Sequence, residues 1–463
     1  MSASVSSLEA ILKEFYLGPV QEQINQEVMV YELFEKASVE WSGKQVIIPL
    51  HVSRNPSTGF RAEGSTLPGS NAAGALPTGN QTYERLVVTA KFLYGRFSLT
   101  GPAISAARAG SNSFISYVEA EMNKLVDDVK NASNRTMVSG GRCVGFCHEK
   151  VPTLVNGNVQ FSGDTSKLNT AAVAAAAVVG ANGLSVSFVR TDTYAEVSLG
   201  VCEIDSANAS AGTFHIDAAS AVGTDFSAVP NGIAIAVIIN DVRDGTGGTP
   251  AVLPALEAAG IFVDAEPLGI YGGLFATPLS GIAGGGDDYF GLNRSTAALA
   301  ELRSTGRCIA DAVNNDPRAP ISLDALQTTM DEVLEKAGTE PNYVFINPAM
   351  RSEYTALLVA TSGQLFTMTD SAKNGDGGFT SLGFNGIPLK TSRHIDKGLV
   401  VMLKTDTWKI TELESKGFAD LDGNVLSRVV NRDAYEGYYR WYYNLVCMRP
   451  NANAVLTGLD FPA

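Results

Sequence analysis

Apolar and polar side chains alternate with a period of two along two stretches near the start of the chain, Gln45–Val52 and Thr82–Tyr94. The apolar positions are Val46, Ile48, Leu50 and Val52 in the first stretch and Leu86, Val88, Ala90, Phe92 and Tyr94 in the second. Successive side chains of a strand point to opposite faces, so this alternation is typical of strands that are covered on one side only. We therefore predict two β-strands, each with one face in water.

The segment that connects these strands, 54–80, is rich in residues that interrupt regular structure. Its glycines and prolines are Pro56, Gly59, Gly64, Pro68, Gly69, Gly74, Pro77 and Gly79. Such a composition excludes a helix, and loops longer than about 12–15 residues without structure of their own are usually functional or disordered. An extended arm that projects from the body and finds its partner on another subunit fits this segment best.

A helical period follows the second strand and predicts one long amphipathic helix, Ser113–Ser139. Its apolar residues recur every three or four positions: Phe114, Val118, Met122, Leu125 and Val129. Asn112 and its two flanking serines offer N-caps, and Gly140 and Gly141 offer the left-handed conformation that ends a helix. At 1.5 Å per residue this helix is roughly 40 Å long. It is long enough to brace a subunit from end to end.

The segments before and after this helix differ in the periodicity of their apolar residues. Residues 8–16 and 20–34 carry helical apolar stripes and predict an N-terminal arm that needs a surface to lie on. Residues 142–288 predict short strands between turns, closed by the glycines of 281–286. Within that region we expect strands over 184–189, 195–201, 213–216 and 233–239, a tight hairpin at Asn156-Gly157 and a helix over 168–179.

The last third of the chain mixes helices and strands. A helix begins after the N-cap Ser322 and ends at Gly338, with the apolar stripe Leu323, Leu326, Met330, Val333 and Leu334. A helical turn around 289–296 comes before it. After it we expect a strand over 343–346, a break at Asn347-Pro348, a helix to Leu358, a mobile loop over 374–386, and strands over 399–403, 408–410, 438–443 and 454–456.

Composition narrows the function. The chain has 463 residues, 45% of them hydrophobic, and a formal net charge of −14. Binding nucleic acid through its phosphates requires clustered Lys and Arg, so this charge argues against it. The five cysteines are scattered and odd in number, the N-terminus lacks a signal peptide, and the longest apolar run, 171–179, is too short to span a bilayer. We expect a soluble protein made in a cytoplasm.

Candidate chemistry is sparse. Cys143, Cys147 and His148 have metal-ligand residue types, but no second Cys/His pair lies nearby. Gly245–Gly248 follows an apolar strand as in a dinucleotide-binding turn, but Pro250 stands where the third glycine belongs. Asp420-x-Asp422-Gly423-Asn424 lacks the distal Glu of a calcium loop. We predict no catalytic residue, no cofactor and no metal site.

The order of elements resembles that of the major capsid proteins of tailed bacteriophages, whose shared architecture is the Hong Kong 97 phage-type fold. An N-terminal arm, a long two-stranded loop, one spine helix and a later mixed domain occur in that order. Three segments also have a local sequence pattern similar to that of these capsid proteins: Asp288-Tyr-Phe-Gly-Leu-Asn-Arg-Ser-Thr296, Ile321-Ser-Leu-Asp-Ala-Leu-Gln327 and Gly338-Thr-Glu-Pro-Asn-Tyr-Val-Phe-Ile-Asn-Pro348. The resemblance covers nearly the whole chain except Arg142–Asp288.

The resemblance implies an α+β fold with seven regions. These are the N-terminal arm 1–43, the extended hairpin loop 44–101, the spine helix and the start of the peripheral domain 102–142, a β-rich insertion 143–288, the return to the peripheral domain 289–320, an axial domain 321–430 and the closing C-terminal strands 431–463. It also implies that the loop contacts neighbouring subunits through Arg54, Phe60, Arg61, Glu63, Leu67, Pro68 and Leu76. No lysine lies between Lys44 and Lys91, so the Lys–Asn cross-link of some relatives has no donor at the loop tip, and the loop is expected to hold by strand pairing and packing.

The implied function is a structural, non-enzymatic subunit of an icosahedral virion shell, assembled in the host cytoplasm. Its implied partners are copies of itself in hexamers and pentamers, portal and scaffolding proteins, decoration proteins, and packaged double-stranded DNA held without sequence-specific binding. No membrane is involved. An encapsulin-like nanocompartment shell is the alternative on the same fold, and a nucleotide-dependent enzyme that uses Gly245–Gly248 is the alternative from another class.

Overall fold

The computed structural model describes 30–37, 41, 43–55, 57–58, 60, 63, 79–101, 113–147, 157–163, 184–195, 197, 202–208, 213–216, 232–239, 265–275, 289–309, 319–362, 382–420, 426–429 and 431–461. The expected helices over 8–16 and 168–179, nearly all of that over 20–34, and the glycine-rich segments 245–248 and 281–286 lie outside these residues. So does most of the arm between 54 and 80.

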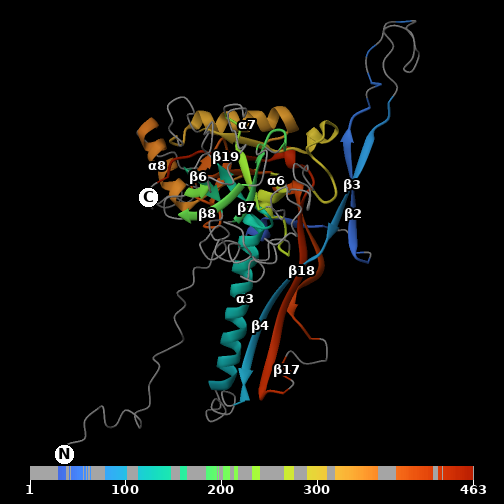
Figure 1. The fold of residues 1–463 in the computed structure, drawn as a ribbon, viewed down its shortest axis with the longest axis vertical. Coiled ribbons are helices and arrows are strands. Elements are labelled where there is room, and N and C mark those ends of the chain that lie inside the picture. The colour runs from blue at the N-terminus through green and yellow to red at the C-terminus, as the bar shows by residue number, and fades with distance from the viewer. Residues whose placement is uncertain are drawn as a thin grey trace, which may run out of the picture.

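The base of the arm is a two-stranded antiparallel sheet, as the alternating pattern predicts. It pairs β2 (Gln45–Ser53) with β3 (Thr82–Thr89), and Val46 lies opposite Val88. The even-numbered face is buried against the short helix η3 (Ala297–Leu302) and Tyr289. The buried face contains Val46, Ile48, Leu50, Val52, Leu86 and Val88. In Figure 1 the two strands β2 and β3 lie beside the body.

The second predicted strand is in fact two strands, and this prediction was wrong in its second half. β3 ends at Thr89, and β4 (Lys91–Thr100) leaves the arm to join a different sheet. Phe92 and Tyr94, which were expected to share the covered face of Leu86, are 55% and 58% exposed. The buried residues of β4 have odd numbers instead, because the strand now packs its other face against a helix.

That different sheet forms the long limb of the molecule (Figure 1). Its central strand is β18 (Ala434–Cys447), which pairs with β4, with β16 (Trp408–Phe418) and with the short β17 (Ser427–Arg428). The two-residue strand β1 (Glu35–Lys36) adds to β16 in parallel. The predicted spine helix is confirmed as α3 (Ser113–Ser139), which lies along β4.

The β-rich region closes into a barrel in the order β10-β5-β6-β9-β8-β7. Its strands are β5 (Cys143–Cys147), β6 (Gly157–Gly163), β7 (Leu184–Arg190), β8 (Cys202–Asn208), β9 (Thr213–Ile216) and β10 (Ile235–Ile239). Three of the predicted strands are confirmed. The prediction over 195–201 is wrong at Ala195 and Val197, which are not in a strand, and the other residues of that range lie outside the described ones. The predicted hairpin at Asn156 lies at the border of the described residues.

The last third builds a six-stranded sheet in the order β11-β19-β15-β12-β14-β13. Its strands are β11 (Thr305–Cys308), β12 (Tyr343–Ile346), β13 (Leu382–Phe384), β14 (Ile387–Thr391), β15 (Val400–Leu403) and β19 (Ala454–Thr457). The helices α7 (Leu323–Ala337) and α8 (Pro348–Ser362) pack with it. The remaining helical segments are η1 (Val30–Leu33), α6 (Gly269–Leu274), η4 (Thr405–Thr407) and η5 (Pro450–Ala452).

Helix α7 has the caps that its sequence predicts. The Ser322 side chain accepts a hydrogen bond from Ala325 N, and Gly338 ends the helix with φ of 65°. Leu334 is an exception in the predicted stripe, since it is 41% exposed. The segment 382–386 of the predicted mobile loop is β13 and a turn, where Asn385 and Gly386 both have positive φ. Residues 289–296 form a bridge and turns, and helical structure starts only at η3.

One hydrophobic core joins the barrel, the long limb and the six-stranded sheet. Phe146 of β5, Phe345 of β12, Trp408 of β16 and Tyr443 of β18 all belong to it. The barrel is therefore packed into the body and is not an appendage. Among the described residues, none of the helices is both long and apolar enough to cross a membrane.

Candidate functional site

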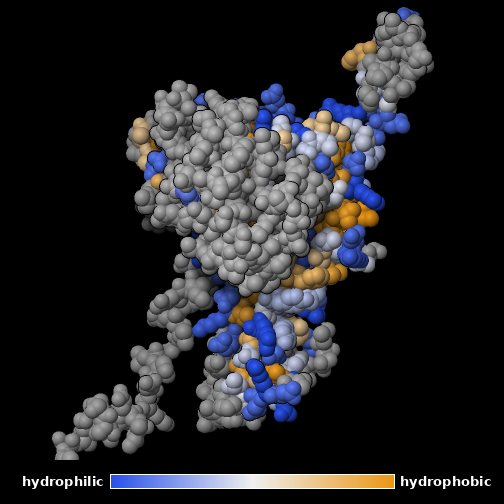
Figure 2. Space-filling view, in the orientation of Figure 1, coloured by the Kyte–Doolittle hydropathy of each residue, from blue (hydrophilic) through white to orange (hydrophobic). Residues whose placement is uncertain are grey.

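The arm base leaves one face open. The odd-numbered side chains of β2 and β3 point away from the buried face, and Ile47 and Tyr83 are 54% and 63% exposed. His51 lies beside Tyr83 with 5.3 Å between the ring centroids. Figure 2 shows hydrophobic surface mixed with hydrophilic residues in the region where Figure 1 places β2 and β3. Exposed apolar side chains that gather on one face are a feature of interaction sites, so we treat this face as a candidate.

Three of the predicted arm contacts are described, and all three are exposed: Arg54, Phe60 and Glu63. The side chain of Phe60 is fully exposed to solvent. Asn55, at the root of the arm, accepts hydrogen bonds from the backbone and hydroxyl of Ser57, which fixes a local turn. Arg61, Leu67, Pro68 and Leu76 lie outside the described residues.

The long limb has a second, partly exposed surface, which we call the outer sheet face; Glu436 in it is buried, and Arg440 and Tyr442 are half-buried. It consists of the side chains of Phe92, Tyr94, Arg96, Glu414, Glu436, Tyr438, Arg440 and Tyr442, which the pairing of β4, β18 and β16 brings together. Tyr94 Oη donates to Tyr442 Oη at 3.0 Å. The Phe92 ring meets the edge of Tyr442 with 5.0 Å between centroids.

Charges on the outer sheet face are balanced in pairs. Arg96 pairs with Glu436, and Arg440 pairs with Glu414. The Tyr438 hydroxyl donates to Glu436 at 2.8 Å, and this hydrogen bond, with Arg96 beside it, holds the pKa of Glu436 below its usual value. The same bond raises the pKa of Tyr438. The face is thus aromatic with two neutralised ion pairs, a composition typical of interface centres, where Tyr and Arg are enriched.

The opposite face of the same sheet is held by the spine helix. Val129 of α3 is buried, and Met122 and Leu125 are half-buried; the side chains of Phe114 and Val118 lie outside the description. Arg135 pairs with Glu266 at 2.7 Å, and Thr136 Oγ1 lies 3.3 Å from Tyr443 Oη. Burial raises the pKa of Tyr443 to about 12. The helix therefore supports the outer sheet face from behind.

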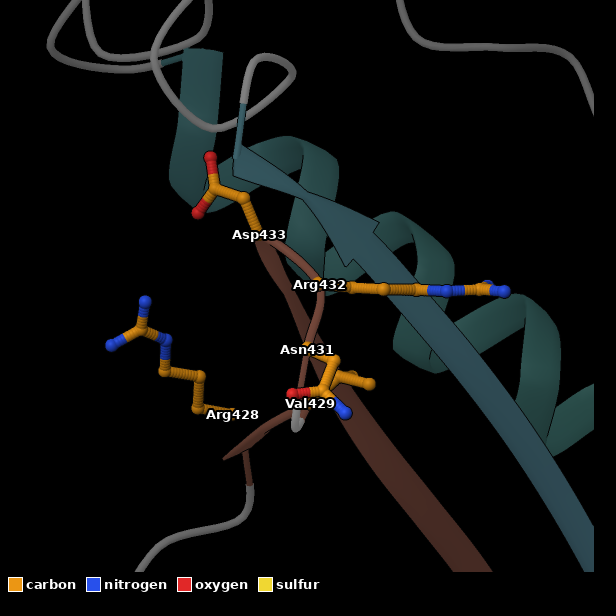
Figure 3. A pocket seen from close by; sticks show the side chains of 5 residues that line it. All are labelled: Arg428, Val429, Asn431, Arg432 and Asp433. Carbon is orange, nitrogen blue, oxygen red and sulfur yellow. The ribbon is translucent and has the colours of Figure 1, made fainter.

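The far tip of the limb has a surface pocket of about 450 Å³ in the turn between β17 and β18. Arg428, Val429, Asn431, Arg432 and Asp433 line it. Figure 3 shows the side chains of Arg428 and Arg432 pointing to opposite sides of the turn. One anion therefore does not bridge the two guanidinium groups, and the pocket lacks the converging donors of a phosphate or carboxylate site.

The sequence candidates for chemistry do not form a site among the described residues. Cys143 and Cys147 are buried in β5, and His148 lies outside the description. The described part of the chain contains no group of three His, Cys, Asp or Glu that could hold a metal ion. Gly245–Gly248 and Asp422 fall on undescribed residues, so the structure has no bearing on them.

Sequence reasoning missed the outer sheet face. Its signal was present as a second alternation, with Phe92, Tyr94 and Arg96 in one strand and Tyr438, Arg440 and Tyr442 in another. Each set has a period of two. Only the pairing of β4 with β18, whose residues are more than 300 positions apart, makes one surface of them.

Comparison with known proteins agrees with the fold. No family model matches the chain, and no curated protein sequence does. The cyanophage A-1(L) capsid structure is similar over 96% of this chain and 97% of its own, with a TM-score of 0.50 and 9% identity. A native GTA particle capsid covers 99% of this chain and 100% of its own, with a TM-score of 0.46 and 8% identity. The chain therefore has the Hong Kong 97 phage-type capsid fold, an inference that rests on the cyanophage structure.

Proposed function

We propose that this protein is the structural subunit of an icosahedral shell that encloses the double-stranded DNA genome of a tailed phage. The observation that carries the proposal is the likeness of nearly the whole chain to the cyanophage capsid structure. Large self-complementary surfaces are what a shell subunit requires, because each copy buries area against other copies. The open face of the arm base and the outer sheet face supply such surfaces.

The arm acts in this proposal as a clamp on a neighbouring subunit. In its described part, the hydrophobic contacts of the arm with its own chain are made by the even-numbered face of β2 and β3. Phe60 is fully exposed. Burying a phenyl ring that is otherwise in water is favourable, so a contact in which a second copy covers Phe60 is stabilised. The packing of β2 and β3 against η3 and Tyr289 provides the base for this contact.

The charge of the chain fits the proposed container. A net charge of −14 favours a wall that does not bind packaged DNA through counterion release. The proposed partners are other copies in hexamers and pentamers, with portal, scaffolding and decoration proteins. The proposed location is the virion, after assembly in the host cytoplasm, and the role is structural and not enzymatic.

Electron microscopy of the purified protein tests this function. Uniform closed shells are expected. A discrete small oligomer as the end state would contradict the proposal. Nuclease protection of DNA in particles isolated from infected cells then tests whether the shell encloses a genome, and particles that carry a protein cargo without DNA would indicate a nanocompartment instead.

A further inference from the structure

Within the described part of the chain, β2 pairs with β3 alone, and its outer edge contains a proline. Which backbone groups of β2 point to that edge can be derived from one hydrogen bond. Val87 N of β3 donates to Phe290 O at 3.0 Å, so the polar groups of Val87 point away from β2. Val87 lies opposite Ile47. In an antiparallel pair, opposite residues alternate between those that bond each other and those whose backbone groups point outward. Ile47 and Val87 are therefore an outward-pointing pair.

The next two odd-numbered pairs are outward-pointing pairs as well. Pro49 lies opposite Arg85, and His51 lies opposite Tyr83. The ring nitrogen of Pro49 thus occupies a position on the outer edge of β2, where a strand would otherwise present an N–H. This explains how a proline is accommodated in the middle of a nine-residue strand without a lost ladder bond to β3.

An incoming strand would need a donor at this position. The carbonyl groups of Ile47, Pro49 and His51 point outward, but the donor between Ile47 and His51 is missing. Proline at an edge is one of the devices by which sheets avoid pairing with another chain. We infer that the edge of β2 is closed to strand addition, and that the arm base binds a second copy of this chain through the side-chain face of Ile47, His51 and Tyr83.

Charge supports a second copy as the occupant of that face. The odd-numbered residues of the arm base are Gln45, Ile47, Pro49, His51, Ser53, Tyr83, Arg85, Val87 and Thr89, so the face has one permanent cation and no carboxylate. The chain as a whole has a net charge of −14. A face without negative charge is therefore complementary to the average surface of another copy.

This inference rests on the proposed shell function and revises the strand pairing expected from the sequence, at least at the base of the arm. Two variants of the full chain test it, with wild type assembled in parallel. Pro49→Val restores the N–H and keeps an apolar side chain. The double variant Ile47→Ser, Tyr83→Ser removes the apolar face while leaving the edge unchanged. Leu334→Ser, at an exposed leucine on α7, is the matched control.

The readouts are particle yield by sedimentation and electron microscopy, and the unfolding midpoint of the unassembled subunit. We expect Pro49→Val to fold normally and to divert protein from closed shells into irregular strand-paired aggregates. We expect the double variant to fold normally and lose its shells, while Leu334→Ser keeps them. Unchanged or more stable shells from Pro49→Val would overturn the inference that the edge of β2 is closed to strand addition. Normal shells from the double variant would overturn the inference that the side-chain face binds a second copy. An equal loss of shells in the Leu334→Ser control would overturn it as well. Absence of shells in the wild type would overturn the shell function and this inference together.

Discussion

Val129 of α3 occupies the space beside Gly95 of β4 that any larger residue at Gly95 would need. A Cβ built on Gly95 would lie 2.7 Å from Val129 Cγ2 and 3.0 Å from Leu125 Cδ1. Real Cβ atoms do not approach other carbon atoms so closely, because packed side chains already touch at about 3.5–4.0 Å. The spine helix therefore packs directly against the backbone of β4 at Gly95, and this contact sets the distance between the helix and the sheet.

Gly95→Ala is expected to lower the stability of the subunit. The added methyl group must push aside the side chains of Val129 and Leu125, and overpacking of this kind costs about 1–3 kcal/mol. Urea unfolding of the unassembled subunit measures the effect. The matched control is Gly417→Ala in β16, where nothing lies within 4 Å of the new Cβ. A urea-unfolding midpoint for Gly95→Ala equal to that of the control would show that close packing of α3 at Gly95 does not contribute to stability.

Ser322→Ala is expected to destabilise helix α7. The Ser322 hydroxyl oxygen accepts a hydrogen bond from Ala325 N at 3.1 Å, and loss of such an N-cap costs about 1 kcal/mol. Ser322→Asp retains an acceptor at the same position and should keep the wild-type midpoint. Hydrogen exchange of the first turn of α7 reports the local effect. Equal protection in the alanine and aspartate variants would contradict the prediction.

Stability is expected to fall as the pH rises from 9 to 12. Burial is the main cause that raises the pKa of Tyr443 from 10.0 to about 12 and that of Cys447 from 9.0 to about 12. Both groups ionise more readily in the unfolded chain, so their contribution is complete below pH 9 and is lost as the pH approaches the folded values. Thermal unfolding across this range measures the loss.

The variant Tyr443→Phe, Cys447→Ala removes both ionisable groups and serves as the comparison for that pH series. Its unfolding midpoint should decline less steeply than that of the wild type between pH 9 and 12. Tyr435→Phe, at a partly exposed tyrosine of the same strand, should follow the wild-type curve. A parallel decline of all three proteins would assign the alkaline loss to other groups.

Deletion of Asn55–Gly79 is expected to leave a folded subunit that does not form stable shells. The described part of the arm base has its hydrophobic contacts outside the deleted segment, with η3 and Tyr289, so β2 and β3 keep their support. Light scattering and electron microscopy measure assembly, and the unfolding midpoint measures the fold. Shells of normal stability from this deletion would remove the arm from its proposed role.

The long helix and the arm strands could be predicted because their signals are local. The bounds of α3 and the caps of α7 follow from side chains that lie within a turn of the helix end, and neighbours in sequence are neighbours in space there. The alternation of Val46 and Ile48 likewise needs only one covered face. The resemblance implied that Phe60 and Glu63 contact a neighbouring subunit; both are exposed, and the contact itself stays a prediction.

The sequence by itself determined α3, α7 and the strands of the arm base, and the tertiary structure decided where β3 gives way to β4 and which face of each strand is covered. At β4 both alternations are apolar, with Phe92 and Tyr94 on one face and Phe97 and Leu99 on the other. The bare backbone at Gly95 lets α3 approach the odd face, which leaves the even face to water. Closure of the barrel and assembly of the outer sheet face depend in the same way on strands paired across long separations, and no local pattern specifies such partners.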